Sequence, residues 1–393
     1  MIELAPHLVA GMELSTLPQQ LINGILLGAI YALIALGYTM VYGVLKLINF
    51  AHGEVFMMGA YAALFASWAL GYTPNNALTG SNPLNLILML LVSMSFCGLL
   101  GVLIERFAYR PLRNQPRIAS LITAIGISLF LQYGGQLFLP SSPAPNIDGK
   151  VNPFVGNLNI TLAQGAGSKA GSLAVVQSKD EMAQKAYDAW KVLHPKADEF
   201  NLPSDGQVLL NSVHDADRAV RDSKDQADSG SLKLSIPRGQ LIMLITTMVL
   251  MALLTYLVMF TKRGRAMRAV SHDFDAAALM GVNVNAIVTF TFLVGSSLAG
   301  AGAMMSATFL SGTKIDTFFG MLPGVKAFVA AVLGGIGNIP GAVLGGLLMG
   351  VAETLVVWLG YDNYRDAIAF VVLIIVLLVR PGGLLGSSKV EKV

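Results

Sequence analysis

Residues Leu17–Leu45 read LPQQLINGILLGAIYALIALGYTMVYGVL and contain no aspartate, glutamate, lysine or arginine. A helix needs about 20 predominantly apolar residues to cross the hydrocarbon core of a bilayer. Within lipid the backbone must satisfy its own hydrogen bonds, so such a run is helical. The residues before it include no lysine or arginine. We therefore expect a retained transmembrane helix rather than a cleaved signal peptide, which would start with basic residues.

The rest of the chain repeats this apolar pattern. Hydrophobic residues make up 54% of the chain and charged residues 12%, whereas a soluble domain carries about 25% charged residues. We predict an all-α integral membrane protein, a polytopic bundle of about eight to nine transmembrane helices. The segment Leu322–Gly341 is expected to be broken or re-entrant. The further apolar runs are Phe50–Leu70, Leu84–Ile104, Ile118–Leu139, Leu241–Phe260, Ala286–Leu310, Val325–Leu333, Ala342–Leu359 and Ala367–Val379.

Basic residues in short loops predict the orientation, because such loops stay in the cytoplasm. Arginines follow the third apolar run, lysine and arginines fill Thr261–Arg268 (TKRGRAMR), and the tail after Arg380 is also basic. The loop Gly71–Pro83 has no charge. We expect a multi-pass membrane protein with the N-terminus outside and the C-terminus in the cytoplasm; the resemblance described below implies the bacterial inner (cytoplasmic) membrane.

Three parts of the chain follow from this alternation. Residues 1–140 and 237–393 hold transmembrane helices, and the second part includes a cytoplasmic loop at 261–283. Residues 141–236 form an external insertion, because Pro140–Pro237 contains 22 of the 49 charged residues. Periodicity and charge in Lys179–Phe200 and Gln207–Gln226 predict two solvated amphipathic helices. Partial disorder is the alternative.

Asn49, His52, Gly53 and Glu54 form the first polar cluster within the apolar pattern, in the sequence Leu47-Ile-Asn-Phe-Ala-His-Gly-Glu54. Polar residues at membrane depth are costly unless they serve a path, a contact or a break. A broken helix exposes backbone groups to a cavity, as in transporters of small zwitterions. The alternative is an interfacial loop in which Asn49 caps the next helix and Glu54 lies in its first turn.

A second polar feature combines Lys326 and Glu353, which lie in neighbouring apolar runs. We favour Lys326 reaching the outer interface and Glu353 facing a partner helix; the alternative is a buried pair on a transport path. Between them, Leu333–Gly341 (LGGIGNIPG) contains too much glycine and proline for a continuous helix. We predict that this second break also lines the substrate path, through Gly334, Gly335, Gly337 and Asn338.

The segment Asp275-Ala-Ala-Ala-Leu-Met-Gly281 follows the basic loop and precedes an apolar run. A short helix from about Phe274 to Met280, ended by Gly281, would present small residues for close docking. Asp275 would be favoured near its N-terminus by the helix dipole. We predict a coupling helix that receives movement from a separate ATPase through Asp275, Ala276, Ala277 and Gly281, with Arg265 and Arg268 beside it. The alternative is an ordinary cytoplasmic connection.

The sequence offers no motif of an enzyme. It contains no Gly-x4-Gly-Lys-Ser/Thr phosphate loop, no His-Glu-x-x-His motif and only Cys97 as a cysteine. We expect no catalytic or metal site, no bound cofactor and no nucleic-acid partner. A membrane protein that moves a solute with energy from a partner fits these features.

Several motifs resemble those of branched-chain amino acid ABC transporter permeases of the LivH type. The resemblance rests on the sequence around Asn49–Glu54, on Ile104–Arg113 (IERFAYRPLR), Leu121–Ser128 (LITAIGIS), Asp275–Gly281, Lys326–Gly341 and Arg380–Gly386 (RPGGLLG). It implies a permease that takes up leucine, isoleucine or valine by alternating access. It also implies a second homologous permease subunit, two ATPase subunits that hold ATP and Mg²⁺, and a periplasmic amino-acid-binding protein.

Two alternatives stay open at this point. The same resemblance extends to permeases for urea, short amides or other amino acids, and the long external insertion could change the solute. A stand-alone ion-coupled carrier would need an intramembrane relay of ionisable residues, for which His52 and Glu353 are the available candidates.

Overall fold

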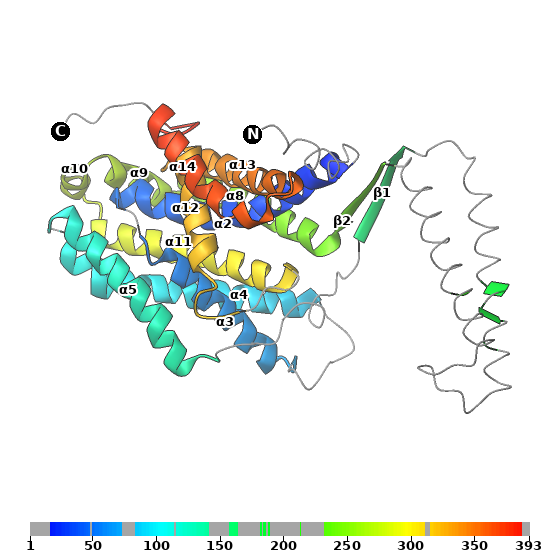
Figure 1. The fold of residues 1–393 in the computed structure, drawn as a ribbon. Coiled ribbons are helices and arrows are strands. Elements are labelled where there is room, and N and C mark those ends of the chain that lie inside the picture. The colour runs from blue at the N-terminus through cyan, green and yellow to red at the C-terminus, as the bar shows by residue number, and fades with distance from the viewer. Residues whose placement is uncertain are drawn as a thin grey trace. The chain divides into compact units, whose positions relative to one another are not determined.

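The computed structural model describes residues 16–47, 49–72, 83–113, 115–140, 157–163, 232–310 and 315–386, with 181, 182, 184, 185, 188 and 213. It divides into two compact units, Met1–Asn157 with Ile236–Val393, and Leu158–Ser235. The helices of the first unit (Figure 1) are α2 (Leu17–Leu45), α3 (His52–Ala69), α4 (Pro83–Ile104), α5 (Arg117–Phe138), α8 (Arg238–Phe260), α9 (Lys262–His272), α10 (Phe274–Leu279), α11 (Val284–Phe309), α12 (Met321–Gly334), α13 (Ile339–Trp358) and α14 (Ala367–Val379).

Helix α2 lies in the middle of this bundle, between α11 and α13 (Figure 1). Its residues from Gly28 to Val41 are all buried. Small residues bring α2 and α13 into backbone contact: a Cβ added to Gly28 would lie 2.6 Å from the Cα of Leu347. Glycine interfaces of this kind allow membrane helices to approach closely. Glycine on α2 therefore serves the packing of this helix against α13.

Helices α3, α4 and α11 meet around a buried serine. The Ser93 hydroxyl lies 2.9 Å from the carbonyl oxygen of Gly59 and 2.8 Å from that of Gly300. A Cβ on Gly300 would lie 2.5 Å from the Ser93 carbonyl oxygen. Cys97 packs beside them, fully buried, with its thiol 3.2 Å from the Val55 carbonyl oxygen. Cys97 is therefore a packing residue of this three-helix contact.

Six helices are long and apolar enough to cross a membrane, counted over the described residues. Helix α3 has 18 residues, whereas α12 has 14 and α14 has 13. At 1.5 Å per residue, α12 spans about 21 Å, less than the hydrocarbon core of about 30 Å. It crosses the direction of α2 and α11 in Figure 1. The prediction of helices interrupted around Leu322–Gly341 is confirmed, although α12 begins earlier than the predicted run at Val325.

The second unit differs from the prediction. Two strands, β1 (Asn157–Ala163) and β2 (Leu232–Pro237), form a two-stranded sheet within 141–236, where only helices or disorder were expected. Both strands carry alternating apolar residues, a period-2 pattern that the prediction overlooked. The helices predicted at Lys179–Phe200 and Gln207–Gln226 lie mostly outside the described residues. The six residues described there are helical.

Candidate functional site

The first polar cluster occupies the connection between α2 and α3. Helix α2 ends at Leu45, where Lys46 adopts a left-handed conformation with φ of 56°. The Asn49 side-chain oxygen accepts hydrogen bonds from the Ala51 backbone N–H at 3.1 Å and from the Tyr109 hydroxyl at 3.0 Å. The N-cap of α3 is Ala51, so the alternative in which Asn49 caps this helix is wrong. Asn49 instead folds the connection and holds it against Tyr109, in the π-helical turn Glu105–Tyr109 that follows α4.

His52 lies behind this connection and is not among the residues that line the cavities described below. It is completely buried, and its ring centroid lies 4.6 Å from that of Tyr38. An added Cβ on Gly37 would meet the imidazole ring, so Gly37 is what leaves room for it. Neither ring nitrogen has a partner at hydrogen-bond geometry among the described residues, although the Ile34 carbonyl lies nearby. His52 is thus a packed core histidine in this conformation.

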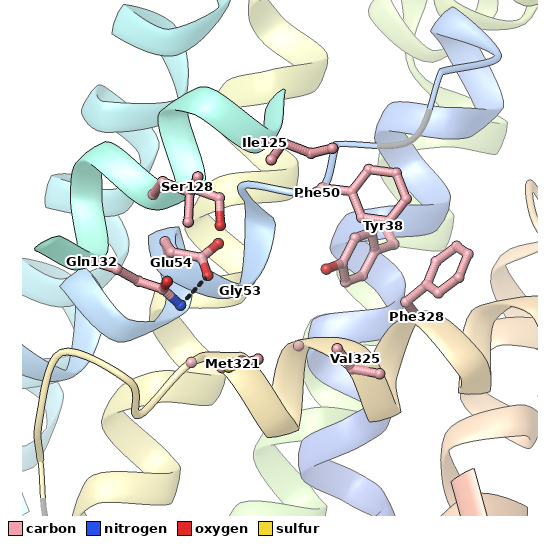
Figure 2. A pocket seen from close by; sticks show the side chains of 13 residues that line it. Tyr38, Phe50, Gly53, Glu54, Ile125, Ser128, Gln132, Met321, Val325 and Phe328 are labelled. Carbon is pink, nitrogen blue, oxygen red and sulfur yellow. Dashed lines mark hydrogen bonds between the residues drawn. The ribbon is translucent and has the colours of Figure 1, made fainter. Parts of the chain in front are cut away.

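Gly53 and Glu54, in contrast, line a cavity of about 250 Å³ between α2, α3, α5 and α12 (Figure 2). The Glu54 carboxylate accepts a hydrogen bond from the Gln132 amide at 3.0 Å. Tyr38 and Ser128 supply hydroxyl groups to the wall. The rest of the wall is glycine and apolar side chains, namely Phe50, Ile125, Leu129, Gly320, Met321, Gly324, Val325 and Phe328.

The first turns of α3 and α12 meet at this cavity. A Cβ on Gly53 would lie 2.8 Å from the Gly320 carbonyl oxygen, and a Cβ on Gly324 would lie 2.8 Å from the Gly53 Cα. Glycine is therefore required on both sides of the contact. The first turn of α12 offers few free donors to the cavity, because the Met321 and Gly324 N–H groups bond the Phe318 and Gly320 carbonyl oxygens and Pro323 has no N–H. The polar groups of the wall are therefore mainly those of side chains.

Lys326 and Glu353 form a buried charge cluster further along α12. The Lys326 ammonium lies 3.0 Å from the Glu353 carboxylate and 2.6 Å from that of Asp366. Tyr31 donates a hydrogen bond of 2.6 Å to Glu353, and Arg365 also pairs with it. The favoured interpretation, in which Lys326 reaches the outer interface, is wrong, because packing of α12 on α13 pairs it with Glu353. A role in a transport path stays a prediction.

The second break does not contribute to the cavity wall. Gly335 and Gly337 adopt φ of 103° and 95°, which permits the tight turn between α12 and α13. A Cβ on Gly334 would meet the Gly341 backbone. Asn338 caps α13 by accepting from the Gly341 N–H, and it donates a 2.7 Å hydrogen bond to the Leu385 carbonyl. These residues join α12, α13 and the C-terminal segment, and their predicted place on a path is untested.

The basic stretch predicted as a loop is the helix α9. The Thr261 side chain starts it by accepting a hydrogen bond of 3.0 Å from the Gly264 N–H. Gly264, Met267 and Val270 form its buried face. Arg265 and Arg268 lie on the exposed face. The amphipathic spacing of Gly264, Met267 and Val270 is the signal in the sequence that indicates this helix.

Helix α10 forms where the coupling helix was predicted. The Asp273 carboxylate caps it by accepting hydrogen bonds of 2.9 Å from the Asp275 and Ala276 N–H groups. Ala277 is buried, while Asp275 and Ala276 are exposed. Gly281 ends the turn with φ of 82°. Two side chains that the sequence interpretation did not single out are Leu279 and Met280, which are 89% and 84% exposed.

The two helical turns after α4, Glu105–Tyr109 and Arg110–Leu112, lie at the same end of the bundle as α9 and the start of α11. Arg113 pairs with Glu105 and hydrogen-bonds Asn285, and Thr289 donates to Glu105 at 2.7 Å. Burial lowers the pKa of the Arg113 guanidinium, and the neighbouring Glu105 opposes this shift. A cavity of about 560 Å³ nearby is lined by both Arg110 and Arg263. The two basic segments therefore share one face, as the predicted orientation requires.

Six described helices long and apolar enough to cross a membrane, with a small cavity between them, define a multi-pass membrane protein. Residues 20–377 match the family described as the branched-chain amino acid transport system permease component, and the chain belongs to this family. The chain is 35% identical over 383 residues to the high-affinity branched-chain amino acid transport system permease protein LivH of Salmonella typhimurium, covering 95% of this chain and 97% of LivH.

Two further relatives agree with this family. The chain is 37% identical over 377 residues to BraD of Pseudomonas aeruginosa, a permease protein of a high-affinity branched-chain amino acid transport system, with 95% and 97% of the two chains covered. A probable branched-chain amino acid transport permease of Methanocaldococcus jannaschii is 31% identical over 156 residues, covering 37% of this chain and 48% of that protein. No solved structure matches the chain.

Proposed function

We propose that this protein is a membrane-spanning permease subunit of a binding-protein-dependent ABC importer that takes up leucine, isoleucine or valine. The observation that carries the proposal is the family match across residues 20–377, together with relatives named for branched-chain amino acid transport. The apolar cavity wall suits aliphatic side chains, since burial of such groups is favourable. This chain supplies the path, and ATP and Mg²⁺ belong to partner subunits.

Helix α10 is the contact through which the ATPase subunits move this chain. Its exposed Leu279 and Met280 would enter an apolar groove, as an amphipathic helix does when it docks on a partner. Arg265 and Arg268 on α9 would approach acidic groups at the rim of that groove, where charge steers association. The buried Ala277 and the cap at Asp273 hold α10 against the bundle, so that movement of α10 is passed to the transmembrane helices.

The complex comprises a second homologous permease, two ATPase subunits and a periplasmic amino-acid-binding protein, in the inner membrane. The N-terminus lies outside and the C-terminus in the cytoplasm. Support for this orientation comes from the shared position of Arg110, Arg113 and Arg263 at one end of the bundle. Closure of the ATPases upon ATP would rock the helices and open the cavity alternately to the two sides.

Reconstituted vesicles test this proposal. Vesicles that contain the complete complex and the binding protein should accumulate leucine on addition of ATP, with no accumulation of urea. The double variant Leu279→Ser, Met280→Ser should abolish stimulation of ATP hydrolysis by the binding protein. Tyr364→Ser, which changes another exposed apolar side chain, should leave stimulation intact. Accumulation of leucine against a gradient by vesicles holding this chain alone would refute the proposal.

A further inference from the structure

The cavity of about 560 Å³ at the basic end of the bundle lies where the turn Arg110–Leu112, α9 and the start of α11 meet. Its volume falls within the range of about 300–1,000 Å³ that is typical of ligand sites. Its wall contains two arginines, Arg110 from the turn and Arg263 from α9. Neither guanidinium has a carboxylate partner in the part of the chain that the structure describes, because Glu105 is engaged by Arg113. The cavity therefore carries an excess of positive charge.

An aromatic ring, rather than an ion pair, holds the Arg263 guanidinium in place. Its Cζ atom lies over the Phe290 ring, 4.7 Å from the ring centroid. A guanidinium above an aromatic ring uses its flat face for this contact, so the N–H groups in its plane stay available to an acceptor. Such N–H groups bind phosphate in pairs, because their spacing matches that of two phosphate oxygens. Arg263 is therefore positioned for a phosphate group in advance of binding.

The neighbouring wall also favours an anion. Asn285 lines the cavity, and its Oδ1 atom accepts a hydrogen bond of 2.5 Å from Arg113, which leaves the side-chain amide N–H groups as donors. Burial and the nearby charge of Arg110 lower the pKa of the Arg113 guanidinium. An anion beside Arg110 would offset this repulsion between like charges.

The wall changes from polar to apolar along α11. Asn283 and Asn285 lie at the start of this helix, whereas Leu293 lies eight residues beyond Asn285, about 12 Å along the axis. Phe290 and Leu293 belong to a helix long and apolar enough to span a membrane, so this end of the cavity lies at the edge of the hydrocarbon layer. A free phosphate ion does not match the apolar end, and a carboxylate on a soluble partner does not reach it. A phospholipid matches both ends.

We propose that this cavity binds an anionic phospholipid, with Arg110 and Arg263 on its phosphate and the first acyl-chain carbons beside Phe290 and Leu293. Basic pockets between membrane helices on the cytoplasmic side hold head groups of this kind. An anionic lipid is favoured over a zwitterionic one, because the described residues of the wall include no acidic side chain to receive an ammonium or choline group. In the orientation proposed above, the lipid belongs to the cytoplasmic leaflet.

The bound lipid would link the end of α4 to α9 and α11, and α9 in turn packs against α10. It would therefore hold in place the helices that carry the exposed helix α10. This inference goes beyond the proposed function and does not depend on which solute the protein transports.

Native mass spectrometry of the complete transporter tests the site with added phosphatidylglycerol, which is anionic, and phosphatidylcholine, which is zwitterionic. The parental complex should bind phosphatidylglycerol more tightly. The double variant Arg110→Gln, Arg263→Gln should weaken phosphatidylglycerol binding about tenfold or more, because hydrogen bonds to charged groups are the strong ones. The matched control is Arg106→Gln, Lys262→Gln, which removes two exposed positive charges beside the same segments but outside the cavity wall. It should change binding less than about twofold.

A second variant keeps the test decisive if the double arginine variant does not assemble. Phe290→Leu keeps both charges but removes the ring under Arg263, and it should weaken phosphatidylglycerol binding about two- to fivefold. Unchanged binding in both variants would overturn the proposal.

Three other outcomes would also overturn it. Equal weakening by the control pair would show a general attraction of lipid to a basic surface. Displacement of phosphatidylglycerol by inorganic phosphate would show a site for the free ion. Loss of ATPase subunits from the double arginine variant, with normal phosphatidylglycerol binding, would assign the two arginines to acidic groups of a partner protein.

Discussion

The contact between α2 and α13 can be tested with a single methyl group. In Gly28→Ala the new Cβ would lie 2.6 Å from the Leu347 Cα and 2.7 Å from the Gly346 carbonyl oxygen. Both are backbone atoms, which cannot move aside as a side-chain end can. Ordinary contact begins at 3.4 Å. The two helices must therefore separate by about 0.8 Å at this point, and a gap of that size forfeits a quarter to a half of each dispersion contact.

The expected cost follows from the number of contacts that this gap weakens. If roughly 30 atom pairs of about 0.15 kcal/mol each lose about a third of their energy, the loss is about 1.5 kcal/mol. This loss agrees with the destabilisation of about 1–3 kcal/mol that is typical when an extra methylene is forced into a well-packed core. The higher helix propensity of alanine returns at most about 1 kcal/mol. Gly43→Ala is the matched control on the same helix, because its Cβ would have no neighbour closer than 3.7 Å.

The assay is reversible unfolding of both variants in mixed micelles with increasing SDS. Gly43→Ala should be as stable as the parent or gain up to about 1 kcal/mol, since it keeps the propensity term without the clash. Gly28→Ala should fall below Gly43→Ala by about 1–3 kcal/mol. A Gly28→Ala protein as stable as Gly43→Ala would refute the close backbone contact between α2 and α13.

Three further tests address other contacts. Lys326→Met and Glu353→Gln should each destabilise the protein in the same unfolding assay, because each leaves a buried charge without one of its partners. The double variant should lose less stability than the sum of the two single losses, by about 0.5–3 kcal/mol; additive losses would contradict the pairing. Asp273→Ala should speed amide hydrogen exchange in α10 by an amount equivalent to about 1 kcal/mol, through loss of the N-cap, and unchanged exchange would argue against the cap. Tyr109→Phe should destabilise the protein by about 1 kcal/mol, because the Asn49 side chain loses its buried hydroxyl donor. Asn49→Ala should then cost less stability in the Tyr109→Phe background than it does in the parent.

Much of the helical architecture was predictable, because a backbone in lipid must form its hydrogen bonds internally and is therefore helical. The run Leu17–Leu45 coincides with α2, and Ile118–Leu139 differs from α5 by one residue at each end. The helix α10 was also predicted, since Gly281 supplies a stop signal that is local in sequence. In each case the deciding information lies within one short segment.

The cavity could not be predicted in the same way. Glu54 and Gln132 are separated by 78 positions, and only the packing of α3 on α5 brings them together. Gln132 was available as a signal, because it is a polar residue inside the apolar run Ile118–Leu139. Within the polar cluster, sequence alone does not separate Glu54, which faces the cavity, from His52, which faces the core. That difference depends on the direction in which the first turn of α3 points.

The ion pair between Lys326 and Glu353 could not be predicted from the sequence either. Snorkelling is the ordinary solution for a lone lysine near a helix end, so the sequence favoured separate surfaces. The structure instead surrounds Glu353 with Lys326, Arg365 and Tyr31. Tyr31 comes from a helix 322 positions away, which no local pattern reports. Hydropathy predicts which segments cross the membrane, but it does not predict which side chains pair between helices that are distant in sequence.

The central place of α2 has a consequence for biogenesis. This helix precedes the other described helices in the chain, yet its closest neighbour, α13, is among the last to be synthesised. Until α13 has been translated, the face of α2 that will contact α13 through Gly28 has only lipid or the insertion machinery against it. Its glycines and the Tyr31 hydroxyl reach their permanent neighbours only after α13 has emerged. Final assembly is thus a late, post-insertional event, and a nascent chain stopped before Glu353 should be recognised by membrane quality control as incomplete.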